Sequence, residues 1–286
     1  MSYTISIDIG GTTFSFIIFK SNNAIYKSNT YSIKKYDNYK EFLNFLIKQI
    51  KIQTKNKTIN LIGIACPGPL NTDTGEILNT PNLTILQYVN IKNYFEKNIK
   101  CDKVLIENDA NVYALGSYYS LKNKCKNDVL LGITLGTGIG FGIIINGYLF
   151  KGSYGMAGEY ELSPLNNNLT WADLIGYKFF KNKSKYHFNE NKTPKHIYEL
   201  AEKNNIDALS IWNQYGKNIG LCLSHVIGII NPNYISIGGG ISKANKFFHN
   251  KIIKTLEDKC LTYRKESINI FYDNNNISNI FLGWLI

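Results

Sequence analysis

Two stretches of this sequence, 126 residues apart, repeat one pattern: a β-branched strand, a glycine-rich turn and a second apolar strand. Ile7-Asp8-Ile9-Gly10-Gly11-Thr12 aligns with Ile133-Thr134-Leu135-Gly136-Thr137-Gly138, and residues 17–18 then align with residues 143–144. Apolar runs that are joined by a short glycine turn are typical of a β-hairpin. The repeat therefore predicts two related domains, each of which begins with a hairpin, and which face each other.

Helical and extended patterns alternate after each hairpin. Apolar residues recur at helical spacing from Tyr39 to Ile50, and a near-continuous apolar run at 59–65 suits a buried parallel strand. In the second half, a mostly helical stretch at 197–230 leads into a short strand at 234–237. This alternation predicts an α/β fold. A polar stretch at 122–128 interrupts the apolar pattern, so we expect domains at 1–121 and 122–286, with a C-terminal tail that packs back on the first domain.

The charge of the chain bears on its partners. The 286 residues carry a net charge of +11, but only Arg264 among the 32 cationic side chains is an arginine, and the lysines are scattered. Recognition of bases relies heavily on arginine, so we expect no nucleic-acid partner. No apolar run has the length of a membrane span and no leader pattern opens the chain, so we expect a cytoplasmic protein without a membrane partner.

The five cysteines are dispersed, and none forms a CxxC pair. Structural zinc sites and redox-active pairs need closely spaced cysteines. We therefore expect reduced thiols and no structural zinc.

The two glycine turns have the composition of phosphate-binding loops. Backbone N–H groups in such turns can approach anionic oxygens closely, and the carboxylate of Asp8, at the end of a strand, suits a magnesium ion. The second turn contains a GxGxxG pattern, but a strand rather than a helix follows it, which argues against a dinucleotide site. Either turn could also be a plain hairpin. The residues concerned are Gly10, Gly11, Thr12 and Thr13 in the first turn, and Gly136, Thr137 and Gly138 in the second.

Three further positions combine a possible chemical role with a plain structural one. Asp109 lies between a buried strand and a helix, where it could accept a proton from a hydroxyl group while the amide of Asn108 orients a polyol. Taken alone, its position favours the role of a helix N-cap. Gly239 follows a strand, where it could leave room for a base or a ribose or could simply join the strand to a helix. Glu159, taken alone, could be a surface acid.

Taken together, these motifs resemble the ROK (repressor, open reading frame, kinase) sugar kinases in order and spacing over nearly the whole chain. The motifs are Asp8-Ile-Gly-Gly-Thr, Ala65-Cys-Pro-Gly-Pro, Pro81-Asn82-Leu83, Asn108-Asp109-Ala110-Asn111, Leu135-Gly-Thr-Gly-Ile-Gly, Ala157-Gly158-Glu159 and Ile237-Gly-Gly-Gly-Ile-Ser.

The resemblance implies an actin-like ATPase (ribonuclease H-like) fold with two similar domains on either side of a central cleft. It also implies transfer of the γ-phosphoryl group of ATP, with Mg²⁺, to the 6-hydroxyl of a hexose-type sugar, and a homodimer. On this mapping Asp109 is the general base. The implied sugar ligands are Gly68, Asn82, Asn108 and Glu159, and the implied nucleotide ligands are Asp8, the two glycine turns and Gly239.

The chain departs from the family where a metal site is usual. Typical members read Glu-x-Gly-His and follow this motif with a cysteine-rich segment, whereas this chain reads Glu159-Tyr160-Glu161-Leu162 and lacks that segment. Leucine binds neither zinc nor a sugar hydroxyl group. The second sugar-binding glutamate of the family has only Asp173 and Glu161 as candidates. The chain thus resembles zinc-free members, some of which are similar to bacterial N-acetylmannosamine kinases.

On this resemblance we expect an N-acetylmannosamine kinase, and there are two alternatives. The enzyme could be a glucokinase or fructokinase, or the chain could be a non-catalytic sugar sensor, since Leu162 replaces the family's histidine. The family's repressors carry an N-terminal helix-turn-helix, which we do not expect here because the strand pattern begins at Tyr3, and Asp109 favours catalysis.

Overall fold

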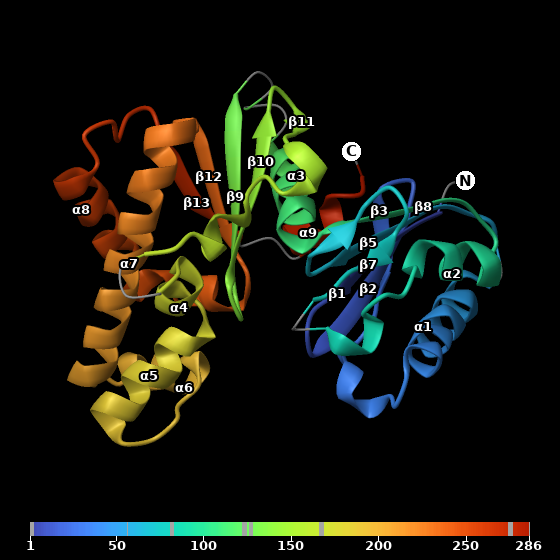
Figure 1. Ribbon diagram of the computed structural model, residues 1–286, viewed down its shortest axis with the longest axis horizontal. Coiled ribbons are helices and arrows are strands. Elements are labelled where there is room, and N and C mark those ends of the chain that lie inside the picture. The colour runs from blue at the N-terminus through green and yellow to red at the C-terminus, as the bar shows by residue number, and fades with distance from the viewer. Residues whose placement is uncertain are drawn as a thin grey trace. The chain divides into compact units, whose positions relative to one another are not determined.

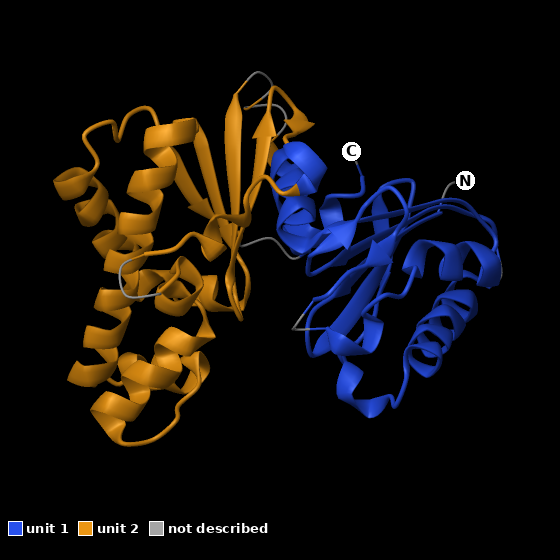
Figure 2. Ribbon diagram, viewed as in Figure 1, with its two compact units in different colours: residues 1–120, 152–155, 276–286 blue, residues 121–151, 156–275 orange. Residues whose placement is uncertain are grey.

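A computed structural model of the chain describes residues 3–55, 57–80, 83–121, 125, 128–165, 169–273 and 277–285. The chain forms two compact units, shown in different colours in Figure 2. Unit 1 comprises residues 1–120, 152–155 and 276–286, and unit 2 comprises residues 121–151 and 156–275. Each unit has its own sheet and its own apolar core.

The sheet of unit 1 has the strand order β3-β2-β1-β5-β8, with a short strand β4 paired to β2. Strand β1 is antiparallel to β2 and parallel to β5, which is in turn parallel to β8. The hairpin and the two parallel strands bring three strand ends together at one edge. The strands are β1 (Tyr3–Ile9), β2 (Thr13–Lys20), β3 (Asn23–Lys27), β4 (Tyr31–Ser32), β5 (Ile59–Cys66) and β8 (Cys101–Asn108).

Helices cover both faces of this sheet, as Figure 1 shows. Successive side chains of a strand point to opposite faces. Accordingly Phe14, Phe16 and Ile18 of β2 pack with α1 and α2, whereas Ile17 and Phe19 pack with the C-terminal tail. The other elements of unit 1 are α1 (Tyr39–Thr54), α2 (Ile91–Asn98), α3 (Asp109–Leu121), α9 (Asn279–Leu282), η1 (Ile33–Lys35), η2 (Thr84–Leu86), η3 (Ser153–Gly155), β6 (Leu70–Asn71) and β7 (Glu76–Ile77).

The sheet of unit 2 repeats the central arrangement of unit 1. Its order is β11-β10-β9-β12-β13, in which β9 and β10 form an antiparallel hairpin and β9, β12 and β13 run parallel. The two glycine segments of the sequence repeat therefore join equivalent strand pairs, as predicted. The strands are β9 (Val129–Leu135), β10 (Ile139–Ile145), β11 (Tyr148–Leu149), β12 (Tyr234–Gly238) and β13 (Asn269–Tyr272).

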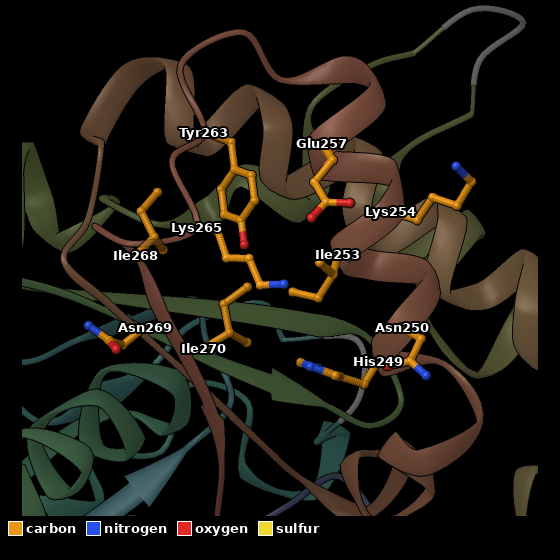
Figure 3. Close-up of a pocket in the computed structure, with 10 residues that line it drawn as sticks. All are labelled: His249, Asn250, Ile253, Lys254, Glu257, Tyr263, Lys265, Ile268, Asn269 and Ile270. Carbon is orange, nitrogen blue, oxygen red and sulfur yellow. The ribbon is translucent and has the colours of Figure 1, made fainter.

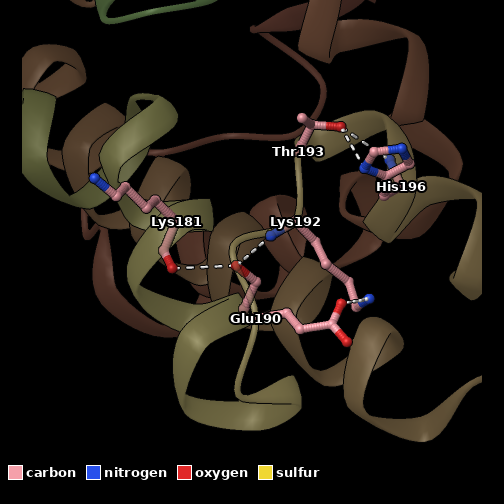
Figure 4. Close-up of polar contacts among 6 residues, drawn as sticks. Lys181, Glu190, Lys192, Thr193 and His196 are labelled. Atoms are coloured by element: carbon pink, nitrogen blue, oxygen red, sulfur yellow. Dashed lines mark hydrogen bonds and ion pairs between the residues drawn. The ribbon is translucent and has the colours of Figure 1, made fainter.

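The long helix α7 supplies much of the core of unit 2, including the buried side chains of Trp212, Tyr215 and Ile219. The connection between α5 and α6 is fixed by the buried Ser184, whose hydroxyl group accepts a hydrogen bond from the backbone N–H of Lys192 (2.9 Å; Figure 4). The other helical elements are η4 (Glu159–Leu162), α4 (Trp171–Ile175), α5 (Tyr177–Phe188), α6 (Pro194–Glu202), α7 (Ile206–Ile230), η6 (Gly240–Phe247) and α8 (His249–Lys259).

A cavity of about 390 Å³ lies in unit 2, between α8 and the edge strand β13 (Figure 3). His249, Lys254, Glu257 and Lys265 contribute to its polar lining, and none of the residues predicted for catalysis or binding lines it. In the parts of the chain that the structure describes, no helix has both the length and the apolar character needed to cross a membrane.

Candidate active site

Three acidic side chains gather at the carboxyl ends of the parallel strands of unit 1. Asp8 pairs with Ala65 of β5 in the strand register, Ala65 pairs with Glu107 of β8, and Asp109 follows two residues later. The carboxyl ends of neighbouring parallel strands are where α/β sheets commonly bind ligands. The topology thus places the predicted base Asp109 and the predicted magnesium ligand Asp8 at one edge of one sheet.

The pKa values of Asp8 and Asp109 are both raised, chiefly by burial. Burial, and secondarily the charge of Asp109, raises the pKa of Asp8 to about 7. Burial also raises the pKa of Asp109, against the opposing effect of a hydrogen bond from the N–H of Ala110. Carboxylates with raised pKa values can exchange protons near neutral pH, as a general base must.

The N-cap of α3 is Asn108 and not Asp109. The side-chain oxygen of Asn108 accepts hydrogen bonds from the N–H groups of Ala110 (2.9 Å) and Asn111 (3.3 Å). Asp109 is the first residue of the helix, and its Oδ1 accepts from the N–H of Ala110 (2.8 Å). The capping interpretation of Asp109 was therefore wrong. The Oδ1 atom of Asn108 is committed to the helix, which leaves its amide NH₂ group as the part suited to a sugar.

Glu107 is a buried member of the cluster that sequence reasoning did not assign. Only 5% of its surface is exposed, and its Oε1 accepts hydrogen bonds from the backbone N–H of Asn108 (3.0 Å) and from Nδ2 of Asn111 (3.1 Å). These bonds fix the turn in which β8 passes into α3. Its position directly before Asn108-Asp109 was visible in the sequence, but its burial was not.

The first glycine turn closes the hairpin of unit 1. The N–H of Gly10 donates to the carbonyl of Thr13 (2.8 Å), and Thr12 and Thr13 are exposed at the tip. The backbone of Gly10 lies outside the left-handed region, and a Cβ there would meet only ordinary contact at 3.4 Å. The fold itself therefore gives little reason for glycine at this position.

In the second glycine turn, too, the fold gives no reason for a glycine, and here the result is clearer. The N–H of Gly136 donates to the carbonyl of Gly138 (3.0 Å), and the carbonyl of Thr137 accepts from the N–H of Tyr177 (2.9 Å). The backbone of Gly136 is outside the left-handed region, and a Cβ there would meet no atom within 4 Å. Neither backbone strain nor packing explains this glycine. Close approach of a ligand to the backbone would explain it.

Gly239, in contrast, is required by the fold. Its φ is +86°, and a Cβ would collide with the backbone of Leu135. The strand-to-turn role of this glycine is therefore sufficient to explain it. The turn also brings the end of β12 against the end of β9, next to the second glycine turn.

Glu159 begins the 3₁₀ helix η4, which lies against β10. The preceding Gly158 has a φ of +89°, and a Cβ there would collide with the carbonyl oxygen of Phe141 in β10. Only glycine permits this approach, and it sets the position of Glu159, which is half-buried.

The remaining predicted sugar ligands receive less support from the structure. Gly68 is half-buried, and its carbonyl oxygen accepts a hydrogen bond from the hydroxyl of Thr80 (2.6 Å). Asn82 lies outside the described residues. The two candidates for a second sugar-binding acid both have other partners: Asp173 binds Thr170 and Lys178, and Glu161 binds the N–H of Ile139.

Comparison with known proteins identifies relatives over nearly the whole chain. Residues 4–168 and 179–276 match the ROK family. The glucokinase of Thermotoga maritima is 26% identical over 277 residues, which covers 89% of this chain and 87% of that protein. The N-acetyl-D-glucosamine kinase of Haemophilus influenzae is 27% identical over 262 residues, covering 82% of this chain and 83% of the relative.

The fold is shared with solved structures. A ROK family glucokinase from Streptomyces griseus, solved in complex with glucose and AMPPNP, superposes with a TM-score of 0.82 at 19% identity. The superposition covers 99% of this chain and 97% of that one. The predicted fold, an actin-like ATPase built from two similar α/β domains, is therefore confirmed.

Proposed function

The chain belongs to the ROK family and is an ATP-dependent carbohydrate kinase, and on this basis we propose the group that it phosphorylates. It transfers the γ-phosphoryl group of ATP to the 6-hydroxyl of a hexose or an amino sugar. The observation that carries this proposal is the position of Asp109 at the end of β8, where Asn108 supplies the helix cap and leaves Asp109 for chemistry.

Asp109 is the general base. It accepts the hydroxyl proton as the sugar oxygen forms a bond to the γ-phosphorus and the bond from that phosphorus to the departing ADP oxygen breaks. Burial raises the pKa of Asp109, so that its proton affinity is closer to that needed at neutral pH than that of an exposed aspartate. Asn108, Gly68, Asn82 and Glu159 orient the sugar, and orientation lowers the barrier because the reacting atoms are already aligned.

The two glycine turns bind the phosphates. The first glycine of each turn, Gly10 or Gly136, donates its N–H within the turn, so the groups that contact phosphate come from Gly11 to Thr13 in unit 1 and from Thr137 and Gly138 in unit 2. Gly239 contacts the nucleoside. The open space at Gly136 is the structural support for this role, since no atom of the protein occupies it.

Asp8 is suited to hold the magnesium ion. Its carboxyl group is close enough to Asp109 for the two charges to repel, and a divalent cation would relieve that repulsion. Among the described residues, no group of three or more His, Cys, Asp or Glu side chains is arranged to hold a metal ion, but Mg²⁺ usually binds one or two carboxylates together with substrate phosphates. When bound, the ion offsets charge on the phosphate oxygens.

N-acetylmannosamine is our first candidate for the acceptor, because the chain resembles the zinc-free members of the family in lacking the histidine and the cysteine-rich segment. Leu162 is 61% exposed and apolar, so it cannot replace the hydrogen bonds of a histidine. Glucose, fructose and N-acetylglucosamine are the other candidates. A non-catalytic sugar sensor is the alternative function, and Leu162 is the observation that favours it.

The test is the release of ADP in the presence of ATP, Mg²⁺ and each sugar in turn: N-acetylmannosamine, N-acetylglucosamine, glucose, mannose and fructose. We expect turnover with at least one of them, and with N-acetylmannosamine the fastest. Sugar binding without turnover for every member of the panel would establish the sensor instead.

The base is tested by Asp109→Asn, which we expect to lower kcat at least about a hundredfold, the usual contribution of general-base catalysis. Asp102→Asn is the matched control, since Asp102 lies exposed on β8, the strand that leads to Asp109, and accepts a hydrogen bond from Asn60. Full activity in the Asp109 variant would show that another group takes the proton.

A further inference from the structure

The short helix η4 is held rigidly in unit 2 by the residues around Glu159. Gly158 brings its backbone against β10, as described above. The hydroxyl of Tyr160 lies 2.9 Å from Nδ1 of His225 in α7, and its ring contacts those of Phe141 and Trp171. The segment is thus fixed to β10, α4 and α7 through Gly158 and Tyr160.

Glu161, on this same helix, reaches the second glycine turn. Its Oε2 accepts a hydrogen bond from the backbone N–H of Ile139 (2.9 Å), the first residue of β10 after the turn. A Cβ at Gly138 would lie 2.5 Å from that same oxygen, so glycine at this position makes room for the carboxylate. A hydrogen bond to an ionised acceptor is stronger than one between neutral groups.

The second half of the turn is consequently held by hydrogen bonds, and its first residue is open. The carbonyl of Thr137 is held by the N–H of Tyr177, and the N–H of Ile139 is held by Glu161. Gly136, the residue before these two points, has no atom within 4 Å of its Cβ position. Glu161 meets the turn at Gly138 and Ile139, and the space beside Gly136 stays open for a phosphate.

We propose that Glu161 is a positioning residue that fixes the second phosphate turn, and that η4 couples sugar binding to nucleotide binding because it carries both Glu159 and Glu161. The coupling rests on the proposed function, in which Glu159 binds the sugar. Glu159, which binds the sugar, and Glu161, which binds the phosphate turn, are two positions apart on the same short helix. Because η4 is held as one piece, a sugar that favours one position of Glu159 favours one position of Glu161 as well, and the effect is reciprocal for binding.

The first experiment needs no substrate. Amide hydrogen exchange of residues 136–141 is compared in the wild-type protein, Glu161→Ala, Glu161→Gln and Glu190→Ala. We expect exchange about tenfold faster or more in Glu161→Ala, because the acceptor of the Ile139 amide is removed. Glutamine retains a side-chain acceptor and should restore most of the protection. Glu190→Ala is the control, since Glu190 is exposed and only pairs with Lys192 (Figure 4).

The second experiment measures the consequences for binding. In Glu161→Ala we expect the KM for ATP to rise about tenfold, because one charge-assisted hydrogen bond that holds the turn is lost. We expect a smaller change in kcat. We also expect a non-hydrolysable ATP analogue to strengthen sugar binding in the wild-type protein and in Glu161→Gln, but not in Glu161→Ala. Glu161→Asp, which keeps the charge but is one methylene shorter, replaces the alanine variant if that variant does not fold.

The outcomes separate the two proposals. Unchanged exchange in Glu161→Ala would overturn the positioning role. Faster exchange with an unchanged KM for ATP and unchanged coupling would overturn the link to nucleotide binding. A wild-type protein that phosphorylates no sugar would remove the proposed function and the coupling with it, whereas the exchange data would still decide whether Glu161 holds the turn.

Discussion

At the scale of single residues, the glycines of this chain divide into those that the fold needs and those that it does not. Gly158 and Gly239 have positive φ values and would collide with backbone atoms if they carried a side chain. Gly136 has neither constraint. A residue whose identity the protein's own packing does not explain is a candidate for contact with a ligand, and this distinction cannot be drawn from the letters of the sequence.

Gly136→Ala tests that distinction directly. We expect the free energy of unfolding to be unchanged or slightly higher, because the alanine meets no atom and reduces the freedom of the unfolded chain. The KM for ATP should rise about tenfold or more, since the methyl group would occupy space that a phosphate oxygen needs. Gly228→Ala in α7, which also meets no atom within 4 Å, is the control and should leave the KM unchanged. Urea unfolding and steady-state kinetics provide the two measurements.

Asp8 gives a prediction for the pH dependence of stability. Its pKa is about 7 in the folded protein against 3.8 for an ordinary aspartate, so the folded state binds more protons than the unfolded state between these values. The free energy of unfolding should therefore fall as the pH rises from about 4 to 7, and level off above. Asp8→Asn should reduce this fall, which urea unfolding of the metal-free protein at several pH values will measure. Identical slopes in the variant and the wild-type protein would contradict the raised pKa.

At the scale of elements, local patterns in the sequence predicted the hairpins and the passage from strand to helix at Asp109, because turn chemistry and apolar periodicity are local. Even the capping of α1 by Asn38 follows from its position. The cap of α3 was misassigned because Asn108 and Asp109 are both good capping residues, and only geometry chooses between them. The contacts that fix η4 could not be predicted, since Tyr160 and His225 are 65 positions apart.

The position of η4 depends on Gly158, and this can be measured. Gly158→Ala adds a strained φ and a collision with the carbonyl of Phe141, so we expect a loss of about 3 kcal/mol in the free energy of unfolding. Gly155→Ala is the matched control, because Gly155 has a φ of +75° and no atom within 4 Å of its Cβ position. It should cost about 1 kcal/mol, the strain alone. Equal losses in the two variants would show that η4 can move away from β10.

At the scale of the whole molecule, metal dependence separates catalysis from folding. We expect EDTA to abolish kinase activity and Mg²⁺ to restore it, while the melting temperature shifts by less than about 2 °C, because the metal is needed for phosphate chemistry and not for the core. Elemental analysis of the chelated protein should find no stoichiometric zinc. One zinc ion per chain, or a large fall in the melting temperature, would contradict the prediction of a zinc-free member.

The C-terminal tail has a consequence for how the protein is made. Trp284 packs on Ala65 and Val112, and Phe281 packs on Ile17 and Phe19, so residues 277–285 cover one face of the sheet of unit 1. Most of unit 1 is synthesised before residue 121, but this face gains its cover only after the whole of unit 2 has been translated. On the ribosome, the growing chain therefore carries an apolar surface for more than half of its synthesis, and this surface is where a nascent-chain chaperone would bind.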